Sequence, residues 1–361
     1  MPNVLIVGFG TIGEPLTVLL TNHREDLGIA DVIFYKHSPR EMDRPDIAMA
    51  QKRGAKLSVA EEKLDEFKKI GINPDMTIEE ARNEATIIVD CTPKRIGRAN
   101  KEKYYDHLLT QGNLNTAIFQ GSEDGAGKKY AFGINDDALI ATGADRDRCI
   151  QVVSCNTHNL AVVSQLLAGD RLQDLVEADF TCIRRASDVS QTDKGPLSPK
   201  VDVHKDARFG THHAKDAREL YQTLNVSPKF FSSAMIVPTQ MMHVVRFRVR
   251  VNGSITVNEI IDRCMANERI AITHKDMASH VFSVGRDHSN AHGRILNPAV
   301  VATPTLSVIK QDGTTDVTGF CFTPQDGNSL ISSVAAICWS LHPDSYLDCL
   351  SPIKQYLFQE V

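Results

Sequence analysis

The chain has 361 residues, 42% hydrophobic and 24% charged, a globular composition that allows a large core and two domains. Its net charge of −5 argues against nucleic acid as the main partner. Eight scattered cysteines without a C-x-x-C pair disfavour a zinc site and a compact disulfide framework, and favour a reducing, cytoplasmic setting. The N-terminus has no basic leader, and no run of roughly 18 apolar residues occurs. We therefore expect neither a signal peptide nor a membrane span.

Strand-like and helical patterns alternate in the first 150 residues. The apolar run Val4–Val7 is typical of a strand buried on both faces, and an apolar helix is expected after it. Further strands are expected at residues 31–35, 86–91 and 116–120, with helices at 47–53 and 61–70. This alternation predicts βαβ units and a parallel sheet.

Residues 8–13 (GFGTIG) fit the G-x-G-x-x-G pattern between an expected strand and an expected helix. Glycines at Gly8, Gly10 and Gly13 permit the tight turn, the close approach of a pyrophosphate and close helix–strand packing. In this context the motif predicts dinucleotide binding. The alternative is a glycine-rich βα turn without a ligand.

The end of the second strand bears on which dinucleotide binds. An Asp or Glu at that place would bind the ribose 2′-OH of NAD. Residues 34–40 (FYKHSPR) contain no acid, and Lys36 and Arg40 are expected to meet a 2′-phosphate. NADP is therefore expected as a cofactor beside NAD, the alternative being that both side chains are only solvated.

Residues 152–159 (VVSCNTHN) form the most informative segment. A strand-like run, 149–154, leads into Cys155, and a helical run, 156–167, begins directly after it. Backbone N–H groups and the macrodipole at a helix N-terminus stabilise a thiolate, which is the nucleophilic form of cysteine. Most lone cysteines are simply buried, but this position predicts a nucleophile. With a nicotinamide site, it suggests aldehyde oxidation through a thioester.

The pattern changes after Cys155. Longer strand-like segments occur at 176–185, 230–236 and 242–251, and in the last of these arginines alternate with apolar residues, as on a half-exposed antiparallel strand. The sequence predicts an α/β chain: an N-terminal Rossmann domain and an α+β catalytic domain with a mostly antiparallel sheet. The expected domains are 1–154 (dinucleotide-binding), 155–322 (catalytic) and 323–361, whose helices (330–341 and 347–358) pack back on the first domain.

A cysteine nucleophile needs a base or a cationic partner. The candidates are His158, His212, His213 and His243. His158 lies inside the expected helix and is expected to point away from the sulfur, whereas His243 begins a strand, a rigid place for a base. The pair His212 and His213 stands before an expected helix and suits an anion.

Arg184 and Arg185 end a strand beside a long polar loop, 187–209, which contains Lys194. Adjacent strand residues point to opposite faces, so at most one of the two arginines is expected to reach the site. With Lys194 and the histidine pair they are expected to form a phosphate-binding rim. The alternative is a set of solvated charges.

Several segments together resemble the archaeal-type, phosphorylating glyceraldehyde-3-phosphate dehydrogenase family. In chain order they are VGFGTIG (7–13), VDCTP (89–93), AIFQG (117–121), VVSCNT (152–157), RRASD and KGP (within 184–196), THHAKDA (211–217) and PTQMMH (238–243). The resemblance spans most of the chain. It implies a homotetramer that uses NAD or NADP, in glycolysis or gluconeogenesis, without a metal.

The resemblance also implies roles for residues. Cys155 becomes the nucleophile and His243 the catalytic histidine, with substrate contacts at Ser154, Asn156, His212 and His213. Cofactor contacts are implied at Thr11, Ile12, Gly121, Arg184 and Gln325, beside Gly8, Gly10, Gly13 and Lys36 from the motifs, and Arg185 and Lys194 are expected to bind substrate or phosphate. The family usually has a threonine at the position of His158, and residues 277–302 match it poorly, so neither receives a role.

The implied reaction begins with attack of the Cys155 thiolate on the aldehyde, and His243 takes the hydroxyl proton as hydride leaves. Phosphate then releases the thioester as 1,3-bisphosphoglycerate. Three alternatives stay open: another cysteine-dependent semialdehyde or acyl-phosphate reductase, a non-phosphorylating aldehyde dehydrogenase, and a cofactor-binding redox sensor in which Cys155 is an oxidation switch.

Overall fold

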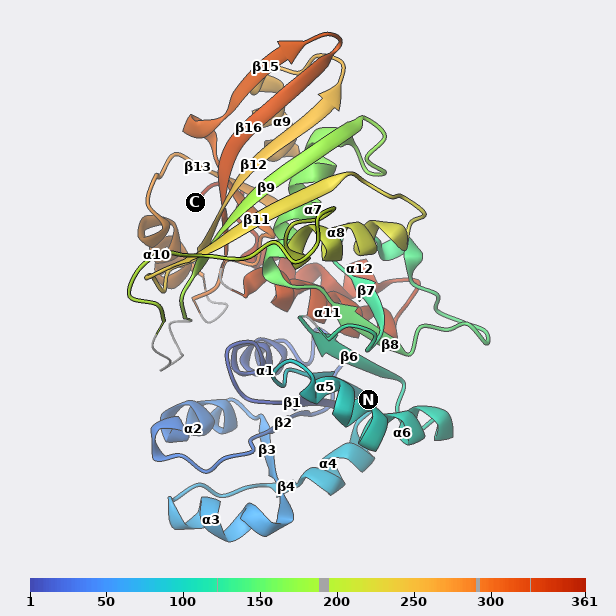
Figure 1. Ribbon diagram of the computed structural model, residues 1–361. Coiled ribbons are helices and arrows are strands. Elements are labelled where there is room, and N and C mark those ends of the chain that lie inside the picture. Colours follow the sequence, from blue (N-terminus) through green and yellow to red (C-terminus); the bar gives the residue numbers. More distant parts are fainter. Residues whose placement is uncertain (122, 188–194, 290–292, 325) are drawn as a thin grey trace. The chain divides into compact units, whose positions relative to one another are not determined.

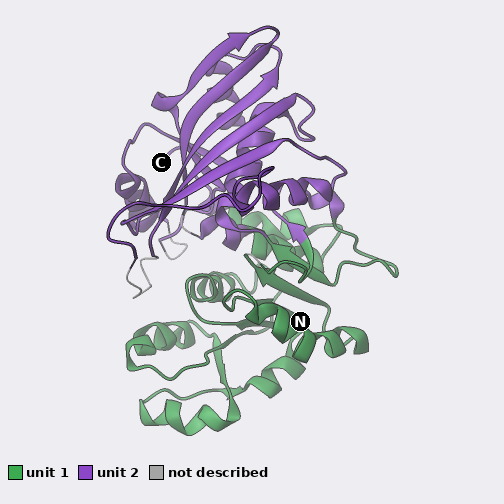
Figure 2. Cartoon of the chain, in the orientation of Figure 1, with its two compact units in different colours: residues 1–128, 139–152, 332–354 green, residues 129–138, 153–331, 355–361 purple. Residues whose placement is uncertain are grey.

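The computed structural model describes residues 1–121, 123–187, 195–289, 293–324 and 326–361. The chain forms two compact units, shown in Figure 2. Unit 1 comprises Met1–Lys128, Leu139–Val152 and Ser332–Lys354, and unit 2 comprises Lys129–Ala138, Val153–Ile331 and Gln355–Val361. The expected boundary after residue 154 lies close to the one after Val152, and residues 129–138 and 355–361 group with unit 2.

A sheet with the strand order β4-β3-β2-β1-β5-β6-β8-β7 forms the centre of unit 1 (Figure 1). Its strands are β1 (Val4–Val7), β2 (Val32–Tyr35), β3 (Lys56–Val59), β4 (Met76–Thr77), β5 (Ile87–Asp90), β6 (Thr116–Gln120), β7 (Lys128–Tyr130) and β8 (Cys149–Val152). The strand pairs from β4 through to β8 are parallel. The predicted Rossmann-type sheet is therefore confirmed.

Helices connect these strands, and the first of them, directly after the glycine turn, is largely buried. They are α1 (Gly13–Asn22), α2 (Arg44–Lys52), α3 (Leu64–Lys69), α4 (Ile78–Glu84), α5 (Ile96–Asn100) and α6 (Asp106–Gln111), with a 3₁₀ turn at Glu41–Asp43 and a π-helical turn at Lys101–Tyr105. Strands β2, β3 and β4 follow β1 in turn on one side of it, and β5, β6 and β8 then follow on the other side of β1. In such sheets a ligand binds at the carboxyl ends of the strands where the order reverses, which here are β1 and β5.

Unit 2 contains a mixed sheet with the order β10-β11-β9-β12-β16-β14-β13, and β15 pairs with β16 (Figure 1). The strands are β9 (Leu175–Arg185), β10 (Lys200–Val201), β11 (Phe230–Val237), β12 (His243–Asn252), β13 (Ile270–Thr273), β14 (Ala299–Ala302), β15 (Ser307–Gln311) and β16 (Thr314–Thr323). The β9–β11 and β13–β14 pairs are parallel and the others antiparallel. The predicted α+β unit with a mostly antiparallel sheet is confirmed.

The main core of unit 2 lies between one face of this sheet and the helices α7 (Cys155–Ala168), α8 (His212–Gln222) and α9 (Val257–Ala266). Helix α10 (Ala278–His288) packs in a separate hydrophobic cluster. Helix α7 is buried from Asn156 to Ala168 and packs on β9 and β12. In β12 the apolar residues face this core and the arginines lie half-buried on the other face. The alternation predicted for residues 242–251 therefore marks a strand with one buried and one half-exposed side.

The C-terminal region differs from expectation in detail. Helix α11 (Gly327–Leu341) begins before residue 330. The second expected helix is only α12 (Tyr346–Leu350), followed by a 3₁₀ segment, Ser351–Tyr356. Pro352 explains this break, because its ring removes a backbone donor from a continuing helix. Among the described residues, no helix has the length and apolar character needed to cross a membrane.

Candidate active site

Cys155 is the first residue of α7, directly after β8 and Ser154. Ser154 is extended and caps the helix, since its hydroxyl oxygen accepts the Thr157 N–H at 3.4 Å. The Asn328 side-chain amide donates to the Cys155 carbonyl at 2.9 Å and so ties α7 to the start of α11. Cys155 is half-buried. A thiol at this place is exposed to the positive end of a long, buried helix, which favours the thiolate.

His243, the first residue of β12, is buried beside Arg185 at the end of β9. The Arg185 backbone N–H donates to His243 Nδ1 at 3.0 Å, and the Arg185 Nη1 lies 3.0 Å from His243 Nε2. Burial, then the charges of Arg185 and Arg184, hold the pKa of His243 well below its usual value. The imidazole is therefore neutral at pH 7.

The two arginines have different partners. The Arg185 guanidinium is buried and lies 3.8 Å from the carboxylate of Asp326, whereas Arg184 pairs with Asp202 at 2.6 Å. Arg185 thus contacts His243 directly, whereas Arg184 influences the pKa of His243 only through its charge. Asp326, which immediately follows the predicted cofactor contact Gln325, was missed in the sequence analysis.

His212 and His213 open α8, with their ring centroids 4.0 Å apart. His212 is exposed, whereas His213 is 3% exposed, and neither ring nitrogen of His213 has a hydrogen-bond partner among the described residues. Burial, then His212, Arg184 and His243, hold the pKa of His213 well below its usual value. A buried polar group without a partner is costly, which indicates a site completed by a ligand.

His158 lies in the first turns of α7, where it is buried and points back along the helix. Its Nδ1 donates to the Ser154 carbonyl at 3.1 Å. Burial lowers the pKa of this histidine to about 4, against the bonds to the Ser154 and Val153 carbonyls, which raise it. The neutral ring thus fills a place in the core and braces the segment that holds Cys155.

The glycine turn in unit 1 follows β1 and opens α1. Gly8 has a φ of +102°, and a Cβ at Gly13 would lie 1.8 Å from the Gly8 carbonyl oxygen, so glycine is required at both positions. A Cβ at Gly10 would meet nothing within 4 Å. Thr11 and Ile12 complete the turn, with Ile12 directly before α1. The open space at Gly10, at the start of a helix, suits an approaching pyrophosphate.

A carboxylate from the 3₁₀ turn after β2 reaches the basic residues that follow this strand. Asp43 ends the 3₁₀ turn after β2, and its carboxylate lies 2.6 Å from the Lys36 Nζ. It also accepts two hydrogen bonds from Arg40, at 2.8 and 3.0 Å. Partial burial favours the neutral acid, but these bonds outweigh it and lower the pKa of Asp43. Lys36 is buried in this ion pair.

The remaining predicted residues are placed as follows. Gly121 follows β6 with a φ of +69°, and its N–H donates to the Val152 carbonyl at 2.9 Å. Asn156 is buried, and its Oδ1 has no hydrogen-bond partner among the described residues. Lys194 and Gln325 lie outside the described residues. Unit 2 thus gathers His213, Arg184, Arg185 and His243 into one electrostatic cluster near α8 and β12.

Comparison with known proteins identifies the family of the chain. Residues 154–288 match the C-terminal domain of glyceraldehyde 3-phosphate dehydrogenase. The chain is 30% identical over 273 residues to the glyceraldehyde-3-phosphate dehydrogenase of Methanobrevibacter smithii, covering 75% of this chain and 74% of that protein. It is 30% identical over 297 residues to that of Halobacterium salinarum, covering 81% of each. The chain belongs to the glyceraldehyde-3-phosphate dehydrogenase family, in its archaeal type.

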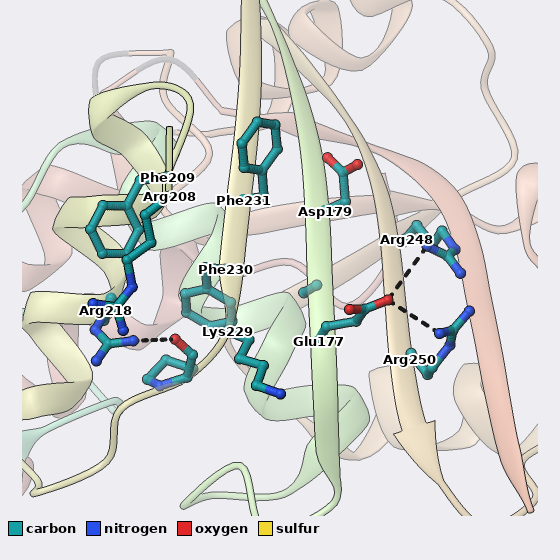
Figure 3. Close-up of a pocket in the computed structure, with 12 residues that line it drawn as sticks. Glu177, Asp179, Arg208, Phe209, Arg218, Lys229, Phe230, Phe231, Arg248 and Arg250 are labelled. Carbon is teal, nitrogen blue, oxygen red and sulfur yellow. Dashed lines mark hydrogen bonds and ion pairs between the residues drawn. The ribbon is translucent and has the colours of Figure 1, made fainter. Parts of the chain in front are cut away.

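A separate pocket of this dehydrogenase-family chain lies on the half-exposed face of the unit 2 sheet. In Figure 3, Glu177 of β9 reaches between Arg248 and Arg250 of β12, with ion pairs of 3.7 and 3.2 Å. The other labelled lining residues are Asp179, Arg208, Phe209, Arg218, Lys229, Phe230 and Phe231. Neither Cys155 nor His243, the two residues predicted for catalysis, is among the residues that line this pocket.

Proposed function

We propose that the protein oxidises glyceraldehyde 3-phosphate with NAD or NADP and phosphate, through a thioester on Cys155. The observation that carries this proposal is the position of Cys155 as the first residue of a buried helix whose start is held by Ser154 and Asn328. Family membership makes the chain an oxidoreductase for which a nicotinamide dinucleotide is implied.

The Cys155 thiolate attacks the aldehyde carbon and forms a thiohemiacetal. In the first turn of α7 the N–H groups of Thr157 and His158 bond to Ser154, and the N–H groups of Cys155 and Asn156 lie in the same turn. Oriented donors at this place stabilise negative charge on the substrate oxygen. The buried Asn156 side chain is a further polar group at this point.

His243 takes the hydroxyl proton of the thiohemiacetal. The low pKa of His243 keeps its ring neutral, which is the form that can accept a proton. Accepting it at Nε2 requires the tautomer with hydrogen on Nδ1, which loses the bond from the Arg185 backbone N–H, and the Arg185 guanidinium must also leave Nε2. Substrate binding must therefore draw the Arg185 guanidinium away, and a phosphate group is a suitable attractor because arginine binds it in a bidentate manner.

Two anions must bind, the phosphate of the substrate and the inorganic phosphate that attacks the thioester. His212, His213 and Arg185 form the proposed binding region, since His213 is buried with no hydrogen-bond partner among the described residues and α8 begins there. Lys194 is retained as a proposed contact from the sequence. Phosphate attack on the thioester carbonyl expels the Cys155 thiolate and yields the acyl phosphate.

The dinucleotide is proposed to bind at the glycine turn of unit 1. When bound, the oxidised nicotinamide accepts the hydride. Gly10 leaves room for the pyrophosphate, whereas the ribose end meets Lys36 and Arg40, both held by Asp43. Gly121, Arg184 and Gln325 stay proposed cofactor contacts. By family analogy we further propose a cytoplasmic homotetramer.

The test is reduction of NAD and NADP by glyceraldehyde 3-phosphate, with and without inorganic phosphate. Turnover that requires phosphate, and its loss in Cys155→Ser with retained NADP binding, supports the proposal. Turnover without phosphate contradicts the acyl-phosphate step and indicates thioester hydrolysis. Near wild-type turnover in Cys155→Ser contradicts covalent catalysis, and Cys182→Ser, a buried cysteine of β9, is the control that should keep its activity.

A further inference from the structure

Two cysteines of unit 1 lie in direct contact, and neither has a role in the proposed reaction. Cys338 lies on α11 and Cys349 on α12, and their sulfur atoms are 2.8 Å apart. Both are free thiols in this structure. A disulfide bond has an S–S length of about 2.04 Å, so the two sulfurs need only a small movement to become bonded.

The connection between the two helices fixes this contact. The His342 N–H donates to the Cys338 carbonyl at 2.7 Å, and the Ser345 N–H donates to the His342 carbonyl at 3.1 Å. The Cys349 N–H then donates to the Ser345 carbonyl at 3.2 Å. This chain of backbone bonds folds α12 back on the last turn of α11, so the two thiols meet through local structure.

The two thiols are not equivalent. Cys338 is fully buried, whereas Cys349 is half-buried and follows Leu347 and Asp348, which are exposed. A hydrogen bond between the thiols holds the pKa of Cys349 below its usual value, and the same contact, with burial, raises that of Cys338. Cys349 is thus the thiol that solvent reaches and that ionises first, and Cys338 is placed behind it.

We propose that Cys338 and Cys349 are a site of reversible disulfide formation, with hydrogen peroxide as the oxidant. The Cys349 thiolate attacks one peroxide oxygen, the O–O bond breaks, and the leaving hydroxide takes a proton to become water. The resulting Cys349 sulfenic acid is attacked by Cys338, the S–O bond breaks, and the second water leaves with the thiol proton. Two thiols and one peroxide thus give one disulfide and two waters.

Peptide mapping of the full-length protein tests the proposal. The native chain is treated with hydrogen peroxide, alkylated and cut before each aspartate. The sequence then places Cys321, Cys338 and Cys349 on three different peptides, 316–325, 326–343 and 348–361. We expect a disulfide-linked pair of peptides 326–343 and 348–361, which disappears after dithiothreitol, while 316–325 stays alkylated.

The oxidised protein should also unfold at a temperature a few degrees higher, because the cross-link restricts the unfolded chain.

The variant Cys349→Ser should give no linked pair, and Cys149→Ser, which removes another half-buried thiol of unit 1, should keep it. Oxidation of Cys155, seen in peptide 147–169, shows that the peroxide was active in the sample. If Cys338 and Cys349 are both alkylated and unlinked in that same sample, the proposal is overturned. Linkage of Cys349 to any other cysteine would overturn it as well. The mapping does not depend on enzymatic activity, so its failure is distinct from failure of the proposed function.

Discussion

Arg185 approaches both ring nitrogens of His243, with its backbone N–H donating to Nδ1 and its guanidinium Nη1 at Nε2, each at 3.0 Å. A neutral imidazole has one acceptor nitrogen, so only one of these contacts is a hydrogen bond. The backbone N–H is fixed by the sheet, and the guanidinium, which also lies 3.8 Å from Asp326, is the partner that can move. The pair therefore links the protonation of His243 to the position of Arg185.

Arg185→Gln should raise the pKa of His243, because it removes the nearer of the two cations that oppose a charged imidazole. NMR titration of labelled histidine rings measures this, with the His243 signal identified by its loss in His243→Asn. Arg184→Gln should raise the pKa less, since Arg184 is the weaker influence and pairs with Asp202. A pKa of His243 that stays constant or falls in Arg185→Gln would show that burial alone controls this histidine.

His158 should make the protein less stable as the pH falls from 6.5 to 4. Burial lowers the pKa of His158 from 6.5 to about 4, so between these values the unfolded chain binds a proton that the folded chain does not. At about 1.4 kcal/mol per pKa unit, the stabilisation lost is about 3 kcal/mol. Urea unfolding at pH 7, 5.5 and 4.5 measures it.

The variant His158→Gln isolates this contribution, since titrating carboxyl groups are common to both proteins. Its free energy of unfolding should fall less steeply with decreasing pH than that of the wild type. His107→Gln is the matched control, because His107 is exposed and its environment changes little on unfolding. Equal slopes for His158→Gln and the wild type would contradict the buried, neutral histidine.

Local patterns were enough to predict most of the fold. The apolar run of β1, the glycine turn and the alternation in β12 each depend on neighbouring residues, and the start of α7 followed from the change of pattern at Cys155. The contacts between distant residues could not be read in this way. Asp43 reaches Lys36 only because a 3₁₀ turn folds back beside β2, and Asn328 reaches Cys155 from a helix far along the chain.

Asp43→Asn should shift cofactor preference towards NADP. The carboxylate now neutralises Lys36 and Arg40, and it would repel a 2′-phosphate brought near them. Its removal frees two cations, so the ratio of the Kd for NAD to the Kd for NADP should rise, by roughly tenfold if the change is worth about 1.4 kcal/mol. Fluorescence titration with both dinucleotides measures the ratio, and Asp46→Asn, on the exposed side of α2, is the control. An unchanged ratio would remove Lys36 and Arg40 from the proposed 2′-phosphate site.

The glycine turn offers a pair of variants that separates folding from binding. Gly13→Ala should destabilise unit 1, since its Cβ would lie 1.8 Å from the Gly8 carbonyl oxygen and the turn would have to open. Gly10→Ala meets no atom within 4 Å, so its free energy of unfolding should stay within about 1 kcal/mol of the wild type. If the pyrophosphate passes over Gly10, however, the added methyl group should weaken binding of both dinucleotides. Urea unfolding and dinucleotide titration of the two variants measure these effects. Wild-type affinity in Gly10→Ala would place the pyrophosphate elsewhere, and a stable Gly13→Ala would contradict the close packing of Gly13 on Gly8.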